Sequence, residues 1–326
     1  MDETVQKIMS PRKGVLALDW SPKTIAKQFL AVGLVSTPEL NRVYRQMLLT
    51  SEGLEKYISA VILHSETVVQ KLDGGLTFPQ YLNNKGIVVG VRADNGSSNY
   101  GDTPQEMSIG LDGLSQRFLE FSKLGIKFTK WRAGFKISDI YPSESFVNES
   151  LDNLSEFAEI SHRFGLVPFV EPDVEISGTH TTTRCAQITA TILTALFKRL
   201  SDMKVNLGNV ILKTNMVMPG VDSGVIASPL EVANATLATL RKTVPKNIGG
   251  IVFLSGGQSF DDSVMHLDKI QDLAINDSWK LSFSYARSLQ KDALLAWKGL
   301  TANNEEAQKI FLTRLLKVAK ARMGEL

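Results

Sequence analysis

The residue in this chain with the clearest chemical potential is a lysine that ends an apolar run. Residues 209–220 read NVILKTNMVMPG, and Lys213 lies where a buried strand would stop. Burial disfavours the ammonium form, and a second nearby cation lowers the pKa of a lysine further toward the neutral amine. A neutral amine is a nucleophile, so the segment indicates a Schiff-base lysine that attacks a substrate carbonyl, although a single such lysine is more commonly ion-paired or reaches solvent.

Groups that would assist this lysine end two other apolar runs. In FTKWRA, strand alternation directs Lys130 and Arg132 to one face and Trp131 to the other, against the helices. In GLVPFVE, Glu171 ends the run. We expect Lys130 to supply the neighbouring charge and Glu171 to carry the protons needed when the carbinolamine loses water.

A phosphate site is indicated by two runs near the C-terminus. LSGGQS, which starts at Leu254, offers closely spaced backbone N–H groups on a glycine turn, and Arg287 ends the run LSFSYAR. A Gly-Gly pair alone more commonly marks a tight turn. Together with an arginine on the next strand it favours bidentate binding of a phosphate.

Eight short apolar runs with polar ends position these residues, and amphipathic stretches of helical period lie between them. The runs are VLALD ending at Asp19, SAVILH at His64, GIVVGVRAD at Arg92 and Asp94, GIKFTKWR, GLVPFVE, NVILK, GIVFLS at Ser255 and LSFSYAR, and the helical stretches include residues 38–54, 105–125, 144–165 and 182–202. This alternation predicts a (β/α)8 barrel, one domain over residues 1–326, whose strand C-termini share one mouth. A doubly wound open sheet is the alternative, but it normally has a glycine-rich first turn, and DWSPKT contains no glycine.

Composition excludes several other classes of protein. The 36 basic and 34 acidic residues are interleaved for a net charge of +2, which predicts no nucleic-acid or membrane partner. Cys185 is the only cysteine and fits a reducing compartment, and the N-terminus lacks the apolar segment of a signal peptide. We therefore expect a soluble, cytoplasmic protein. The four histidines lack metal-ligand spacing, and we interpret His64, which ends a strand, as a hydrogen-bonded core residue.

Six motifs follow one another along the chain: GVLALDWSPKTIAK, LGIKFTKWRAGFKI, VPFVEPDV, VILKTNMVMPG, FLSGGQS and LSFSYARSLQ. In order and at similar spacing, they resemble the motifs of class I fructose-1,6-bisphosphate aldolases. Each motif alone is unspecific, whereas the combination is specific and covers nearly the whole chain. The resemblance implies a metal-independent lyase of glycolysis and gluconeogenesis that needs no cofactor. Such an enzyme reversibly cleaves fructose 1,6-bisphosphate to dihydroxyacetone phosphate and glyceraldehyde 3-phosphate through a lysine imine, and a homotetramer is the assembly that the family suggests.

The resemblance also implies a role for each matching residue. Lys213 would form the Schiff base, and Glu171 would act as acid and base in its formation. Asp19 would take the proton of the C4 hydroxyl during cleavage of the carbon–carbon bond. Lys130 and Arg132 would assist near the reacting centre.

Two sets of residues are implied to bind the phosphates of the sugar. They are Ser255, Gly256, Arg287 and the backbone N–H of Ala286 at the dihydroxyacetone end, and Ser21, Thr24 and Arg92 at the distal end. The distal end departs from animal members of the family, because Trp20, Gln28 and Arg92 stand where those enzymes carry Glu, Arg and Lys. We expect a bisphosphate to be preferred, with less strict discrimination at this end.

Two alternatives to this function remain open. One is a Schiff-base aldolase for another ketose phosphate, such as tagatose or sedoheptulose bisphosphate or fructose 1-phosphate. The other is a non-catalytic relative kept as a scaffold, since a fold does not by itself imply a function. The intact charged residues at the strand ends argue against the second alternative.

Overall fold

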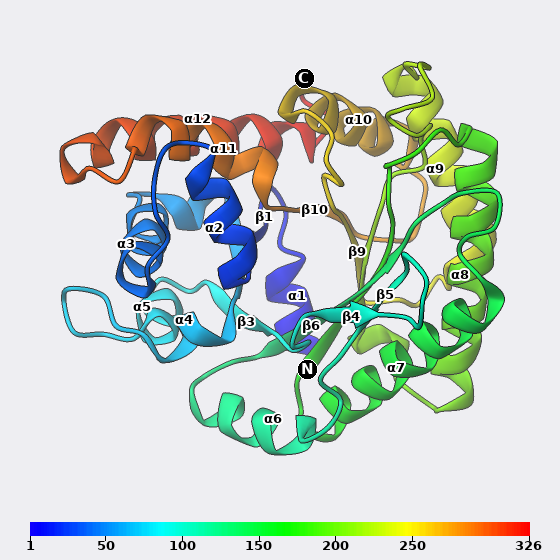
Figure 1. Cartoon of the computed structure of the whole chain (residues 1–326), viewed down its shortest axis with the longest axis horizontal. Helices are drawn as coiled ribbons and strands as arrows, with labels where there is room; N and C mark the ends of the chain where they lie inside the picture. The colour runs from blue at the N-terminus through cyan, green and yellow to red at the C-terminus, as the bar shows by residue number, and fades with distance from the viewer.

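The structure, a computed structural model, describes residues 1–326, and its centre is a closed barrel of eight parallel strands (Figure 1). In barrel order the strands are β1 (Gly14–Leu18), β2 (Ile58–Leu63), β3 (Val88–Arg92), β6 (Phe128–Phe135), β7 (Val167–Val174), β8 (Ile211–Thr214), β9 (Gly250–Phe253) and β10 (Leu281–Tyr285). Each strand lies within or overlaps one of the eight apolar runs. The (β/α)8 barrel predicted from the sequence is therefore confirmed.

The helices form an outer ring around the strands (Figure 1). They are α2 (Pro22–Leu30), α3 (Pro38–Leu49), α4 (Ser65–Val69), α5 (Phe78–Asn84), α6 (Leu114–Lys123), α7 (Glu144–Arg163), α8 (Thr182–Asp202), α9 (Pro229–Thr243), α10 (Phe260–Leu273), α11 (Arg287–Trp297) and α12 (Asn304–Ala321), with short 3-10 helices at Leu54–Lys56, Leu207–Asn209 and Thr301–Asn303. Helix α8 begins and ends at the expected residues. Thr181 Oγ1 caps its start by accepting from the N–H of Arg184 (3.2 Å).

Two layers of apolar side chains hold the barrel together. The larger layer, of 72 buried residues, lies between strands and helices, and the smaller one, of 13 residues, fills the barrel interior. Val5, Ile8 and Met9, from α1 (Asp2–Ile8) and its C-cap, belong to the interior layer. Since Ser59 Oγ at the start of β2 donates to the carbonyl of Ile8, α1 closes the barrel at the N-terminal ends of the strands. The opposite end is left as the mouth.

The helix expected over residues 105–125 is wrong in its first part. β5 (Glu106–Ser108) instead pairs antiparallel with β4 (Ser97–Asn99), and α6 begins only at Leu114. Gly110 and Gly113 adopt φ values of 115° and 69°, which a right-handed helix does not contain. The glycines therefore separate a hairpin from the helix.

None of the helices combines the length and the apolar character that crossing a membrane requires.

Candidate active site

Strand alternation brings a set of polar side chains to the mouth of the barrel. The interior layer includes Ala17, Ile62, Phe169 and Ile211, and a step of two residues along a strand keeps the same face. The mouth residues on this face include Asp19, His64, Arg92, Lys130, Glu171 and Lys213. Trp131 points the other way, as predicted, and packs on Phe157 of α7 with ring centroids 5.7 Å apart.

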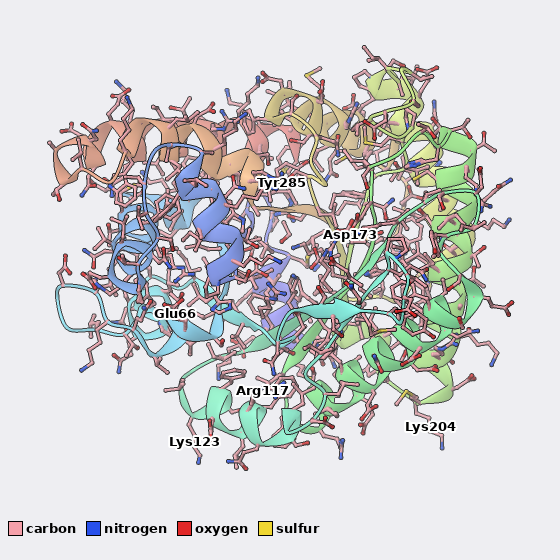
Figure 2. The ribbon with its side chains drawn as sticks, in the orientation of Figure 1. Glu66, Arg117, Lys123, Asp173, Lys204 and Tyr285 are labelled. Carbon is pink, nitrogen blue, oxygen red and sulfur yellow. The ribbon has the colours of Figure 1, made fainter.

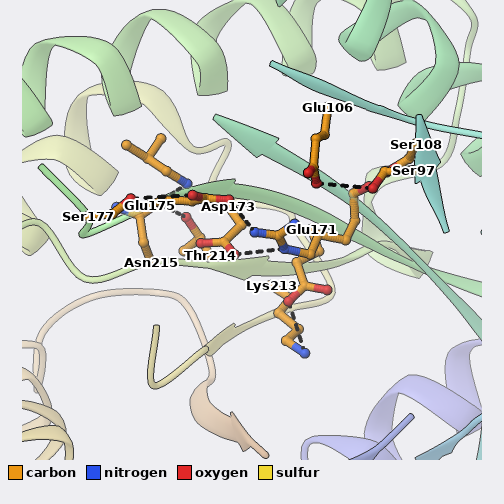
Figure 3. A network of polar contacts seen from close by, with 12 residues as sticks. Ser97, Glu106, Ser108, Glu171, Asp173, Glu175, Ser177, Lys213, Thr214 and Asn215 are labelled. Atoms are coloured by element: carbon orange, nitrogen blue, oxygen red, sulfur yellow. Dashed lines mark hydrogen bonds and ion pairs between the residues drawn. The ribbon is translucent and has the colours of Figure 1, made fainter. Parts of the chain in front are cut away.

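Four of these mouth residues form a continuous chain of alternating charge. Lys213 Nζ lies 3.0 Å from Glu171 Oε1, and Lys130 Nζ lies 2.7 Å from Glu171 Oε2. Lys130 Nζ also donates to Asp19 Oδ2 at 3.1 Å. All four residues are at most 7% exposed. Figure 3 shows the contact between Glu171 and Lys213. Glu171 therefore lies between Lys130 and Lys213 and contacts both of them.

The charges of this chain hold one another ionised. Burial alone would raise the pKa of Asp19 and of Glu171, but the ammonium groups of Lys130 and Lys213 outweigh it and hold both pKa values below their ordinary range. Burial would lower the pKa of Lys130, and the two carboxylates raise it instead. Lys130, Asp19 and Glu171 are thus ionised in the resting site, and each lysine contacts a carboxylate with which it can exchange a proton.

Hydrogen bonds of Asn215, which follows β8, join the segment after Lys213 to the end of β7. The N–H of Val174 and the hydroxyl of Thr214 both donate to Asn215 Oδ1, each at 3.3 Å (Figure 3). Asn215 Nδ2 in turn donates to Thr189 Oγ1 of α8 at 3.3 Å. Because these groups are buried, the residues that follow Lys213 tie its strand to the strand of Glu171.

Arg132 lies in the same mouth but is engaged by a second pair of carboxylates. Its Nε donates to Asp173 Oδ2 (2.9 Å) and its Nη2 to Glu175 Oε1 (2.8 Å) (Figure 3). The side chain remains 37% exposed. Burial raises the pKa of the Asp173 carboxyl, although the Arg132 guanidinium acts in the opposite direction. Figure 2 shows Asp173 toward the middle of the molecule, whereas Lys123 and Lys204 lie at its edge. The Arg132 guanidinium is therefore held at the rim of the charged chain.

The expected phosphate site at the ketone end lies across β9 and β10. These strands are in register at Phe253 and Phe283, so the residues that follow both strands lie side by side. Gly256 has a φ of 56°, which only a glycine adopts readily. Ala286 precedes α11, and Arg287 is the first residue of that helix, is exposed and has no ion-pair partner within the chain. An unpaired guanidinium beside a glycine turn suits an incoming anion.

At the expected distal site the donors are only partly free. Ser21 Oγ caps α2 and lies 3.0 Å from Thr24 Oγ1. Arg92 Nε donates to Asp94 Oδ1 at 2.6 Å, and Asp94 is buried. Trp20, which was expected beside Asp19 near the substrate, has its ring stacked on Tyr44 of α3 instead, with centroids 6.3 Å apart. Strand alternation directs it to the face opposite that of Asp19.

His64 is a mouth residue that the sequence reasoning left out. It follows the last residue of β2 and is only partly buried. As the N-cap of α4, its Nδ1 accepts the N–H of Glu66 at 3.3 Å. Strand alternation from Ile62 would have identified it. Cys185 is buried, as expected of a core residue. The chain contains no group of three or more His, Cys, Asp or Glu side chains arranged to hold a metal ion.

Comparisons with known proteins give one family model, several sequence relatives and a solved structure that are similar to this chain. The family model Glycolytic, described as fructose-bisphosphate aldolase class-I, matches residues 1–326. Fructose-bisphosphate aldolase C of Carassius auratus is 40% identical over 316 residues, which cover 96% of this chain and 87% of the relative. The cytosolic fructose-bisphosphate aldolase 4 of Arabidopsis thaliana is 39% identical over 318 residues, which cover 97% of this chain and 81% of the relative. Fructose-bisphosphate aldolase of Plasmodium falciparum, solved in complex with TRAP and a small-molecule inhibitor, superposes with a TM-score of 0.96 at 36% identity over 99% of this chain and 94% of its own.

Proposed function

The chain belongs to the class-I fructose-bisphosphate aldolase family, lyases of glycolysis, and we propose that it cleaves fructose 1,6-bisphosphate through an imine on Lys213. The observation that carries this proposal is the carboxylate of Glu171, which contacts the ammonium groups of both Lys213 and Lys130 in a buried mouth. A lysine with a proton acceptor 3.0 Å away can become the neutral amine that attacks a ketone.

Imine formation uses Lys213 and Glu171. Transfer of a proton from Lys213 to Glu171 frees the amine, which adds to C2 and forms a C–N bond while the π electrons of the C2 carbonyl pass to its oxygen. A proton moves from the nitrogen to that oxygen, which gives the carbinolamine. Glu171 then returns its proton to the carbinolamine hydroxyl, which leaves as water, and the protonated imine remains. Lys130 is protonated in the resting site, since Asp19 and Glu171 raise its pKa, and Asp19 still pairs with it while Glu171 holds the proton.

Carbon–carbon cleavage uses Asp19 on the far side of Lys130. Asp19 takes the proton of the C4 hydroxyl, the C3–C4 bond breaks, and its electron pair passes to the imine, which becomes an enamine while the aldehyde product forms. Protonation at C3 and hydrolysis of the imine release dihydroxyacetone phosphate. The pKa of Asp19 lies below its ordinary range, so the carboxylate is ionised and ready to accept this proton.

The phosphates would bind at opposite sides of this charged chain. Arg287, Ser255, Gly256 and the N–H of Ala286 would hold the phosphate of the ketone half, and Ser21, Thr24 and Arg92 would hold the distal phosphate. Arg132, already paired with two carboxylates, would line the mouth between them. The residues at the ketone end include an exposed guanidinium without an internal partner, which supports this assignment.

Location and assembly are part of the same proposal. The Arabidopsis relative is a cytosolic enzyme, and we expect this chain in the cytoplasm as well. A homotetramer is the assembly expected from the family, and light scattering of the purified protein tests it. The expected partner of the site is a small phosphorylated sugar, and the covalent imine takes the place of a metal or organic cofactor.

A coupled cleavage assay tests the proposed function. Fructose 1,6-bisphosphate, fructose 1-phosphate, and tagatose and sedoheptulose bisphosphates are compared, each with and without EDTA. The expected result is the highest kcat/KM for fructose 1,6-bisphosphate and no effect of EDTA. Preference for another sugar would change the substrate, loss of activity in EDTA would contradict the imine route, and no turnover on any of the sugars would indicate a scaffold.

A further inference from the structure

His64 lies between two residues that the proposed mechanism uses. The residue before it, at the end of β2, is in register with the residue before Asp19 on β1 and with the residue before Arg92 on β3. Asp19, His64 and Arg92 therefore form one row across three adjacent strands. All three side chains continue the interior face of their strands, so the imidazole faces the mouth.

The hydrogen bonds of His64 leave one ring nitrogen available to a ligand. Nδ1 accepts the N–H of Glu66 at 3.3 Å, so the neutral ring carries its proton on Nε2. Nε2 has no partner within the chain, and it is not among the buried polar atoms that lack one, so solvent reaches it. The mouth thus contains an N–H donor that is oriented by its cap to α4 and is not engaged by the protein.

The charges around His64 favour an anionic ligand and a neutral imidazole. Burial lowers its pKa, the guanidinium groups of Arg45 on α3 and Arg92 on β3 lower it further, and Asp19 and Glu66 oppose this shift only in part. Arg92 is itself shared with Asp94, which removes part of its capacity to bind a phosphate. An additional uncharged donor beside Arg92 would complete the hydrogen bonds of a phosphate without adding to the cations already buried there.

We propose that His64 is a substrate-binding residue of the distal phosphate subsite and donates its Nε2–H to a phosphate oxygen next to Arg92. The inference rests on the proposed function, because the distal phosphate is defined by a bisphosphate sugar. It assigns to His64 a role in specificity, since a monophosphate sugar without a distal phosphate does not make this contact.

Two substitutions separate this role from the cap of α4. H64N keeps a short side-chain acceptor that can cap α4, but it does not reach the position of Nε2. H64Q places an amide N–H at about the distance of Nε2 from the backbone. H64N is expected to raise the KM for fructose 1,6-bisphosphate about ten-fold, the loss of one hydrogen bond to a charged group. The KM for fructose 1-phosphate should stay within about two-fold, and H64Q should recover most of the loss.

The inference is overturned if H64N changes both sugars alike, if it changes neither, or if H64Q is as impaired as H64N. Turnover of fructose 1-phosphate shows that each variant is folded, and H64S, which also caps a helix, replaces H64N if that variant does not fold. A wild-type enzyme that fails to cleave fructose 1,6-bisphosphate contradicts the proposed function itself. If the wild-type enzyme cleaves fructose 1,6-bisphosphate but H64N has the same ratio of KM values for the two sugars as the wild type, only the role of His64 is contradicted.

Discussion

Replacing Glu171 with glutamine removes the carboxylate that two buried ammonium groups share. Its Oε atoms lie 2.7 Å from Lys130 Nζ and 3.0 Å from Lys213 Nζ, and the residue is only 4% exposed. Glutamine keeps the shape of the side chain but neither accepts a proton from an ammonium group nor neutralises it. The substitution therefore tests catalysis and charge balance in a single variant.

The two effects have different expected sizes. A positioned acid or base contributes typically 10² to 10⁴-fold to rate, so kcat should fall by about that factor while KM changes little. Removing one partner of a buried ion pair costs about 3–5 kcal/mol, because a charge is left without compensation. Asp19 still pairs with Lys130, which places the expected loss of unfolding free energy toward the lower end of this range.

The assay combines steady-state cleavage of fructose 1,6-bisphosphate with urea unfolding, and Glu175→Gln is the matched control. Glu175 lies on the same face after β7, but it contacts Arg132 and is 25% exposed, so this variant should lose no more than about 1 kcal/mol and keep most of its kcat. The reasoning is refuted if folded Glu171→Gln keeps more than about a tenth of the wild-type kcat, or if both variants lose kcat equally.

Four further substitutions follow from the same structure. Arg287→Ala should raise the KM at least about ten-fold for bisphosphate and monophosphate sugars alike, whereas Arg92→Ala should raise it only for fructose 1,6-bisphosphate. Steady-state kinetics with both sugars test this, and an equal rise in the two KM values for Arg92→Ala would contradict its role at the distal phosphate. Gly90→Ala should destabilise the fold by about 1–3 kcal/mol, because its Cβ would lie 2.3 Å from the Phe128 ring, and an unchanged urea midpoint would contradict this packing. The lowered pKa of Asp19 adds to the free energy of unfolding above pH about 4, and this contribution is lost as the pH falls. Between pH 7 and pH 3, the midpoint of urea unfolding should therefore fall more for the wild type than for Asp19→Asn.

The sequence predicted the strands and the mouth because both depend on local patterns. A short apolar run with a polar end gives a buried strand and the residue that ends it, and barrel closure brings such ends together whatever the loops do. Lys213 and Glu171 were expected in one cluster for this reason, and the structure brings them to 3.0 Å. The barrel fold and the cluster of charged residues at its mouth can thus be predicted from the periodicity of apolar residues.

Which charged residues pair with one another in the mouth could not be predicted in the same way. Lys130 was expected to supply a charge near Lys213, and Glu171 contacts both lysines because β7 lies between β6 and β8 in the barrel. The side-chain contacts across β6 and β7 are not fixed by the register alone, which pairs Glu171 with Arg132. Arg132 was expected near the reacting centre, and its pairing with two carboxylates depends on how far β7 extends. His64 was set aside by residue type, whereas its face of the strand was the informative feature.

The assignment of Lys213 as the Schiff-base lysine is tested most directly by trapping the imine. Borohydride added together with dihydroxyacetone phosphate reduces a protonated imine to a stable secondary amine, and peptide mass spectrometry locates the modified lysine. The expected result is a single adduct on Lys213 that is absent from Lys213→Ala, which should also have no cleavage activity. An adduct mainly on Lys130, or no adduct in an enzyme that cleaves the sugar, would contradict the account.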